Sequence, residues 1–302
     1  LFLILILVGT PMAVGTLWAE EKPIIVMALD SDLDNLEPSF FKTDSAYYLV
    51  NNLYQSLLTE KLKPDAKGQV LMGQFTFEPD GAESLDYSAD GKCAIFKIRR
   101  GMKFTNGKPV TAHSFKYGID RALLGPGYLA SLLELGGVTS ADQIQVKDDY
   151  TLEVCAEQRT PMFESLFAFN VIPAMDEETS KAHATADDPW GTEWYKTNAV
   201  GSGPYILKEW TPGKQYVVEP NPDYWRGRGF YKNARLVVKL IPSPENRELL
   251  LKRGAIDLAI GIPFKDVDDL KKDPNVNIIE IPYSRVRFLG WNNKIPPFDN
   301  VR

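Results

Sequence analysis

Three aspartates at alternate positions, Asp30, Asp32 and Asp34, are the first residues along the chain whose spacing could serve a chemical purpose. They match the first ligand positions of a calcium-binding helix-loop-helix. The pattern fails at its sixth position, where Asn35 replaces glycine, and at its twelfth, where Phe41 replaces a bidentate glutamate. A solvated acidic loop is the better interpretation, and the sequence predicts no metal site.

Residues suited to nucleophilic or nucleotide chemistry are also few. The two histidines, His113 and His183, are both predicted to be exposed, so a serine or cysteine nucleophile lacks its base. Residues 125–130 fit the G-x-G-x-x-A pattern, but a predicted helix precedes them, whereas a pyrophosphate site needs a strand before the glycines. The sequence therefore predicts no cofactor and no enzyme, with a secreted hydrolase as the alternative.

The two cysteines, Cys93 and Cys155, fall on the polar sides of two predicted strands. If these strands pair antiparallel with the cysteines opposite each other, Ile95 faces Glu153, and the register is self-consistent. Export of the protein would allow the pair to oxidise. Two unpaired thiols are the alternative, which we favour because cross-strand pairs only sometimes meet disulfide geometry.

The composition is that of a globular protein. The chain has 302 residues, of which 44% are hydrophobic and 25% are charged, and its formal net charge is −6. The length allows about two domains. An acidic chain without basic blocks is poorly suited to bind nucleic acid, so no such partner is expected.

The chain begins with an uncharged segment, and its first charged residue is Glu20. An apolar run followed by small and turn-forming residues is typical of a secretory signal peptide, here without the basic segment that usually begins it. We therefore predict a partial signal peptide over 1–19 and an exported, soluble protein, with a membrane anchor as the alternative. Because no cysteine lies near the expected cleavage site, a lipoprotein is not expected.

The apolar spacing predicts a mixture of helices and strands, which indicates an α/β or α+β fold. Helices are expected to begin near Asp44–Ser45, after Thr111 and at Pro244, where capping residues or an N-terminal proline occur. Residues 187–197 are expected to be irregular. Strands are predicted at 23–29, 93–98, 151–156, 257–262, 276–281 and 285–291.

Four motifs follow one another in order along the chain. They are residues 104–112 (FTNGKPVTA), 200–205 with 221–225 (VGSGPY and NPDYW), 241–257 (IP, then R, then GAID) and 292–302 (NNKIPPFDNVR). Together they resemble the extracellular solute-binding proteins of family 5, the peptide- and nickel-binding class of ABC importers. The resemblance extends from about residue 23 to the last residue.

The resemblance implies an α/β fold of the periplasmic binding protein type II, in the three-lobe form of family 5. Lobe I would comprise residues 20–61 and 199–287, and lobe II would be the insertion 62–198. Residues 288–302 would be the crossover into lobe III, most of which is missing from this chain. Such a fragment is expected to bind no peptide tightly by itself.

The resemblance also implies a function. The protein would capture a small solute, for which a peptide is the first expectation, in the periplasm and deliver it to an ABC permease at the inner membrane. The protein would be a monomer without a catalytic step. Nickel chelates, haem and oligosaccharides are the alternative ligands, and a transcription regulator is a further alternative that the signal-like start argues against. The implied ligand-binding residues are Ser31, Asp32, Leu33, Tyr128, Trp291 and Asn292.

Overall fold

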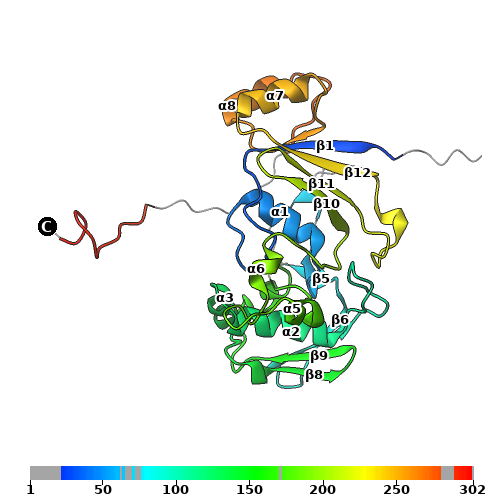
Figure 1. The fold of residues 1–302 in the computed structure, drawn as a ribbon, viewed down its shortest axis with the longest axis vertical. Coiled ribbons are helices and arrows are strands. Elements are labelled where there is room, and N and C mark those ends of the chain that lie inside the picture. Colours follow the sequence, from blue (N-terminus) through cyan, green and yellow to red (C-terminus); the bar gives the residue numbers. More distant parts are fainter. Residues whose placement is uncertain are drawn as a thin grey trace, which may run out of the picture.

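The structure is a computed structural model that describes residues 22–61, 63–64, 70–71, 76–169, 172–279 and 289–300. Two β-sheets, one of five and one of four strands, organise this part of the chain (Figure 1). We call the parts built around them the five-stranded module and the four-stranded module. The predicted signal peptide, residues 1–19, lies outside the described residues. The predicted α/β class is confirmed.

The five-stranded sheet combines the first strand of the chain with strands from its last third, in the order β10-β11-β12-β1-β13. Strand β1 is parallel to β12 and β13, whereas β11 is antiparallel to β12 and to β10. The bounds are β1 (Ile24–Leu29), β10 (Tyr205–Thr211), β11 (Gln215–Pro220), β12 (Arg235–Leu240) and β13 (Leu258–Ala259). The strand predicted at 23–29 is confirmed, and the one predicted at 257–262 is shorter than expected.

Side-chain caps determine where the helices of this module begin. The hydroxyl of Thr43 accepts a hydrogen bond from the backbone N–H of Ala46, so the cap lies one residue before the predicted Asp44–Ser45. Ser243 caps the helix that begins at Pro244, as the sequence indicates. The helices are α1 (Asp44–Leu53), α7 (Pro244–Lys252) and α8 (Phe264–Leu270).

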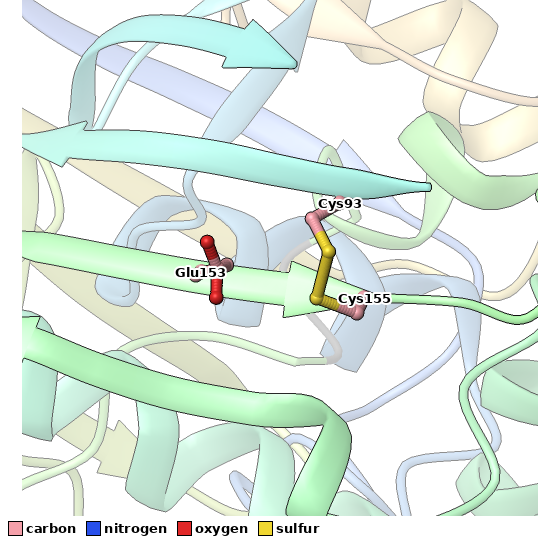
Figure 2. A group of neighbouring side chains, drawn as sticks. All are labelled: Cys93, Glu153 and Cys155. Carbon is pink, nitrogen blue, oxygen red and sulfur yellow. A yellow bond between two sulfur atoms is a disulfide. The ribbon is translucent and has the colours of Figure 1, made fainter. Parts of the chain in front are cut away.

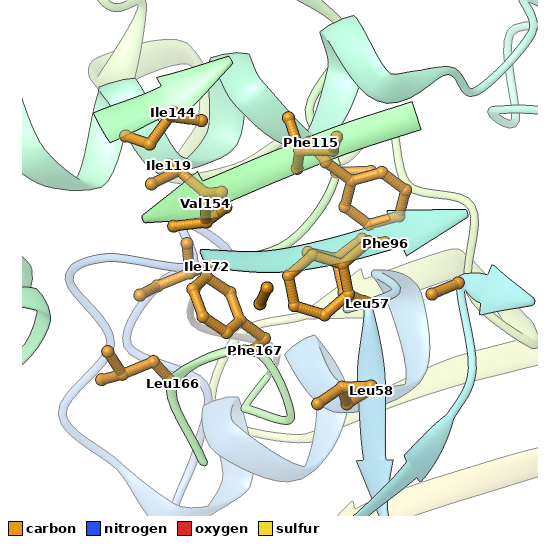
Figure 3. Packing of buried hydrophobic residues seen from close by; sticks show 14 of the residues in the cluster. Leu57, Leu58, Phe96, Phe115, Ile119, Ile144, Val154, Leu166, Phe167 and Ile172 are labelled. Carbon is orange, nitrogen blue, oxygen red and sulfur yellow. The ribbon is translucent and has the colours of Figure 1, made fainter. Parts of the chain in front are cut away.

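The four-stranded sheet is antiparallel throughout, in the order β6-β7-β9-β8, and helix α2 packs on its inner face. Thr111 and Ser114 form a capping box at the start of α2, which confirms the predicted cap. Phe96, Phe115 and Phe167 lie at the centre of the core (Figure 3). The bounds are β6 (Ala82–Tyr87), β7 (Cys93–Ile98), β8 (Ile144–Asp148), β9 (Thr151–Cys155), α2 (Ala112–Leu124) and α3 (Leu129–Leu135).

Short elements complete the described chain. The irregular segment expected at 187–197 contains one turn of helix. Residues 276–279 are not a strand, contrary to the prediction for 276–281, and residues 289–291 are not a strand either. The remainder of both predicted strands lies in 280–288, outside the described residues. The short elements are β2 (Leu58–Glu60), β3 (Lys63–Pro64), β4 (Val70–Leu71), β5 (Phe77–Pro79), α4 (Phe163–Leu166), α5 (Glu177–Ala182), α6 (Thr192–Tyr195), and 3-10 turns at Ala141–Gln143 and Arg228–Phe230.

The cysteine pair occurs in the predicted register. Cys93 on β7 lies opposite Cys155 on β9, and Ile95 lies opposite Glu153. The structure joins the two sulfur atoms in a disulfide, which corrects our preference for two unpaired thiols. The physical reason is the register itself, because directly opposed side chains on one face of an antiparallel pair lie close together.

Candidate functional site

The carboxyl ends of three parallel strands meet at one edge of the five-stranded sheet. Ligands of α/β proteins commonly bind outside such an edge. Here β12, β1 and β13 are followed by loops that begin at Ile241, Asp30 and Ile260. We call these three loops the sheet-edge loops.

One buried arginine holds two of the sheet-edge loops together. Arg247 on α7 is 2% exposed. Its Nη1 donates hydrogen bonds to the carbonyl oxygens of Ile241 (2.6 Å) and Pro242 (3.0 Å). Its Nη2 donates to the carbonyl oxygen of Gly261 (2.8 Å). Arg247, the arginine of the 241–257 motif, therefore holds backbone carbonyl groups in position and does not offer a free charge to a ligand.

The third sheet-edge loop contains the predicted ligand residues Ser31, Asp32 and Leu33. The carboxylate of Asp32 accepts hydrogen bonds from the backbone N–H of Leu33 (2.8 Å) and of Gly213 in the β10–β11 turn (2.5 Å). Ser45 on α1 donates to the carbonyl oxygen of Ser31 (2.5 Å). The Leu33 side chain is 5% exposed and belongs to the core. The Asp32 carboxylate, the Leu33 N–H and the Ser31 carbonyl oxygen are thus all engaged within the protein.

The charge of Asp32 also acts on the core below it. Burial raises the pKa of Tyr216, and the nearby Asp32 carboxylate raises it further. Both effects disfavour a phenolate. Tyr216 therefore stays neutral beneath the loop at physiological pH.

The fourth predicted ligand residue, Tyr128, comes from the four-stranded module. Its side chain is half exposed, and partial burial raises its pKa. The preceding Gly127 has φ +117° and lies so near Phe40 that an added Cβ would be 3.2 Å from the ring. The structure thus brings the loop of Tyr128 against the segment that follows the Asp30–Leu33 loop.

The last two predicted residues, Trp291 and Asn292, are not brought to the sheet edge. The Trp291 ring packs edge-on against Phe298, with 5.9 Å between centroids. Asn292 Oδ1 accepts a hydrogen bond from the backbone N–H of Lys294 (3.0 Å). Figure 1 shows their segment, residues 289–300 (red), away from the two modules.

Sequence reasoning missed a buried ion pair next to this site. Glu37 is 0% exposed and Arg121 on α2 is 4% exposed. The guanidinium donates from Nη1 to Oε1 (2.5 Å) and from Nη2 to Oε2 (2.6 Å). The acidic segment was expected to be solvated, and for Glu37 that expectation is wrong. The pair joins the segment after β1 to the four-stranded module.

A second contact between the modules explains part of the 221–225 motif. The Trp225 ring lies under the guanidinium of Arg99, 3.8 Å from the ring centroid, and Arg226 lies 4.8 Å away. Arg226 also donates to Asp80 (3.2 Å). Burial raises the pKa of Asp80, although hydrogen bonds from Gln55 and Arg226 oppose this effect.

A hollow of about 470 Å³ lies elsewhere, beside β10. It does not include the predicted ligand residues. Its lining comes from β10, the chain segment 197–201, Leu53 and Thr105. We give greater weight to the sheet edge, because several positioned loops converge there.

Within the described residues, no helix is both long and apolar enough to cross a bilayer.

The sequence pattern of the bacterial extracellular solute-binding proteins, family 5 Middle, matches residues 76–302. This chain belongs to that family. The family resemblance is therefore confirmed. Family 5 comprises binding proteins rather than enzymes, so the expectation of a non-enzymatic protein is also confirmed at the level of the family.

Two curated relatives are from Escherichia coli (strain K12). The "Probable D,D-dipeptide-binding periplasmic protein DdpA" is 30% identical, over 94% of this chain and 52% of its own length. The "Periplasmic oligopeptide-binding protein OppA" is 27% identical, over 93% of this chain and 51% of its own length. The chain thus spans about half the length of these relatives.

Solved structures of family members share the fold. MoaA of Agrobacterium tumefaciens R10 in complex with mannopinic acid has a TM-score of 0.77 at 21% identity, over 93% of this chain and 53% of that one. DppA of Helicobacter pylori in complex with the peptide STSA has a TM-score of 0.69 at 22% identity, over 83% of this chain and 49% of that one. The α/β architecture is therefore that of known solute-binding proteins.

Proposed function

We propose that this chain forms part of a periplasmic solute-binding protein of an ABC importer and that peptides are its foremost ligands. The observation that carries the proposal is the set of sheet-edge loops, held in place by Arg247 and Asp32. The names of two relatives, a D,D-dipeptide binder and an oligopeptide binder, support the peptide class.

The chemistry of the loops supports an amide ligand. The Asp32 carboxylate already accepts two backbone hydrogen bonds, and the Leu33 side chain is buried. In this proposal the backbone N–H and C=O groups of the loops that these internal contacts do not use pair with the backbone of a peptide. Recognition through backbone groups tolerates varied ligand side chains, as a peptide importer requires.

The rest of the proposed site comes from outside the sheet edge. In this proposal lobe I (20–61 and 199–287) supplies one wall, lobe II (62–198) supplies Tyr128, and the crossover at 288–302 supplies Trp291 and Asn292 at the hinge side. In this proposal the second wall corresponds to the part of the relatives that this chain does not span, and closure of the two walls determines specificity. The protein would work as a monomer in the periplasm and deliver its ligand to a permease in the inner membrane.

The test is calorimetry of the protein extended to the full length of its relatives, titrated with a pool of di- to pentapeptides. We expect binding with a Kd of about 1 μM or below. If the protein bound a nickel chelate, haem or an oligosaccharide tightly and bound no peptide, the assignment to the peptide class would be contradicted. Mass spectrometry of the peptides after incubation would reveal cleavage, which would support the hydrolase instead.

The variant Arg247→Met tests the sheet-edge loops in the same protein. We expect peptide affinity to fall by at least about tenfold, because three charge-assisted hydrogen bonds to two loops are lost. Arg253→Met, at an exposed arginine six residues later, is the matched control and should leave affinity within about twofold. Unchanged affinity in Arg247→Met, in protein shown to be folded by circular dichroism, would remove the sheet edge from the site.

A further inference from the structure

The disulfide of the four-stranded module has a carboxylate beside it. Figure 2 shows Cys155 and Glu153 two positions apart on β9 and Cys93 on the neighbouring β7. The two sulfur atoms and a carboxylate oxygen all lie within 4.8 Å of one another. All three side chains are half-buried, so a solvent-borne reagent can reach them. The opposite face of these strands is core, so the strands hold the three groups in fixed register.

The charge around the three groups suits a cation once the sulfur atoms are reduced. Two thiolates and one carboxylate carry three negative charges at the surface of the sheet. A positively charged side chain lies next to these groups: Lys147 on β8, whose Nζ is 2.6 Å from Glu153 Oε1. Lys147 is 45% exposed and can turn into solvent, because its long side chain keeps many rotamers there. Its ammonium can therefore give way to a metal ion.

We propose that these residues form a metal site with two exclusive states. In the oxidised state Cys93 and Cys155 share the disulfide. A dithiol reductant gives two electrons to the S–S bond, its own two thiols become a disulfide, and their two protons pass to Cys93 and Cys155. Zn²⁺ then displaces both protons and binds the two thiolates and the Glu153 carboxylate, with water as fourth ligand. Thiolate and carboxylate are established zinc ligands, and three protein ligands with one open position is a known zinc arrangement.

Metal-ligand spacing in the sequence does not reveal this site. Cys93 and Cys155 are 62 residues apart, and only the antiparallel register of β7 and β9 brings them together. The site also lies on the four-stranded module, whereas the proposed solute site lies at the edge of the five-stranded sheet. It therefore does not depend on the proposed function.

The experiment titrates Zn²⁺ into the protein in a competition assay with a chromophoric chelator, with oxygen excluded. As isolated from an oxidising compartment, the protein should show no free thiol under denaturant and should bind Zn²⁺ weakly. After reduction and removal of the reductant it should bind one Zn²⁺, at least about 100-fold more tightly. Co²⁺ should give the absorption bands of a tetrahedral thiolate complex in the reduced protein alone.

Three variants distinguish the assigned ligands from surface binding. The double variant C93S/C155S should lose the reduction-dependent affinity. Glu153→Gln should weaken Zn²⁺ binding by about tenfold or more. Glu157→Gln, at an exposed carboxylate outside the group, should leave it unchanged. The proposed site would be overturned if oxidised and reduced protein bound Zn²⁺ with equal affinity. It would also be overturned if the double serine variant bound Zn²⁺ as tightly as the reduced protein. Full affinity in Glu153→Gln would overturn the assignment of the carboxylate.

Discussion

Replacing Glu37 by glutamine is expected to lower the free energy of unfolding by about 3–5 kcal/mol, because it leaves the charge of Arg121 buried without its partner. Both side chains are at most 4% exposed, and the pair is bidentate. The carboxylate also accepts a hydrogen bond from the backbone N–H of Ser39 (3.0 Å). Urea denaturation followed by tryptophan fluorescence measures the change.

An exposed ion pair provides the matched control. Glu177 and Lys181 lie one turn apart on α5, with exposed fractions of 47% and 69%. Glu177→Gln is expected to change the free energy of unfolding by no more than about 0.5 kcal/mol. The double variant Glu37→Leu with Arg121→Met should recover much of the loss, because it removes both buried charges. A loss below about 1 kcal/mol in Glu37→Gln would mean that water reaches the pair.

The second large effect is expected from Gly201→Ala, in the segment between the four-stranded module and β10. A Cβ at this position would lie 1.8 Å from the carbonyl oxygen of Leu53, at the end of α1. Backbone cannot move aside as a flexible side chain can, so we expect a loss of about 3 kcal/mol or more. The same denaturation experiment measures it.

Gly229→Ala is the control for this substitution. An added Cβ at Gly229 meets nothing within 4 Å, and its φ is not in the left-handed region. The expected change is within about 0.5 kcal/mol. If Gly201→Ala were equally mild, the close approach of the 200–205 motif to α1 would not be needed for stability, and the motif would require another explanation.

Features decided by neighbouring residues could be predicted from the sequence. Thr111 was expected to cap a helix, and it does so within a capping box. The alternation of Cys93 with Ala94 separated the outer from the inner face of β7, and the register that the sequence analysis considered for β9 is the observed one. Side-chain periodicity and capping are local, so a single sequence carries them.

Contacts between distant segments could not be predicted in this way. Glu37 and Arg121 are 84 residues apart, and nothing in an acidic loop indicates which carboxylate will be buried. The expectation that Ser31–Leu33 would face a ligand came from resemblance, and the structure shows that the Asp32 carboxylate is already engaged. Trp291 and Asn292 rest on the same resemblance, and their placement at the hinge stays a prediction.

The position of β1 between β12 and β13 has a consequence for how the chain is made. Its partners begin at Arg235 on one side and Leu258 on the other, so pairing must wait for about 210 further residues. At the usual pace of synthesis, about 5–20 residues per second, that interval is about 10–40 s. Throughout it β1 is an apolar segment with two open edges, which invites pairing with other chains. The hazard of misassembly therefore concentrates on the first strand to be synthesised, which is among the last to be enclosed.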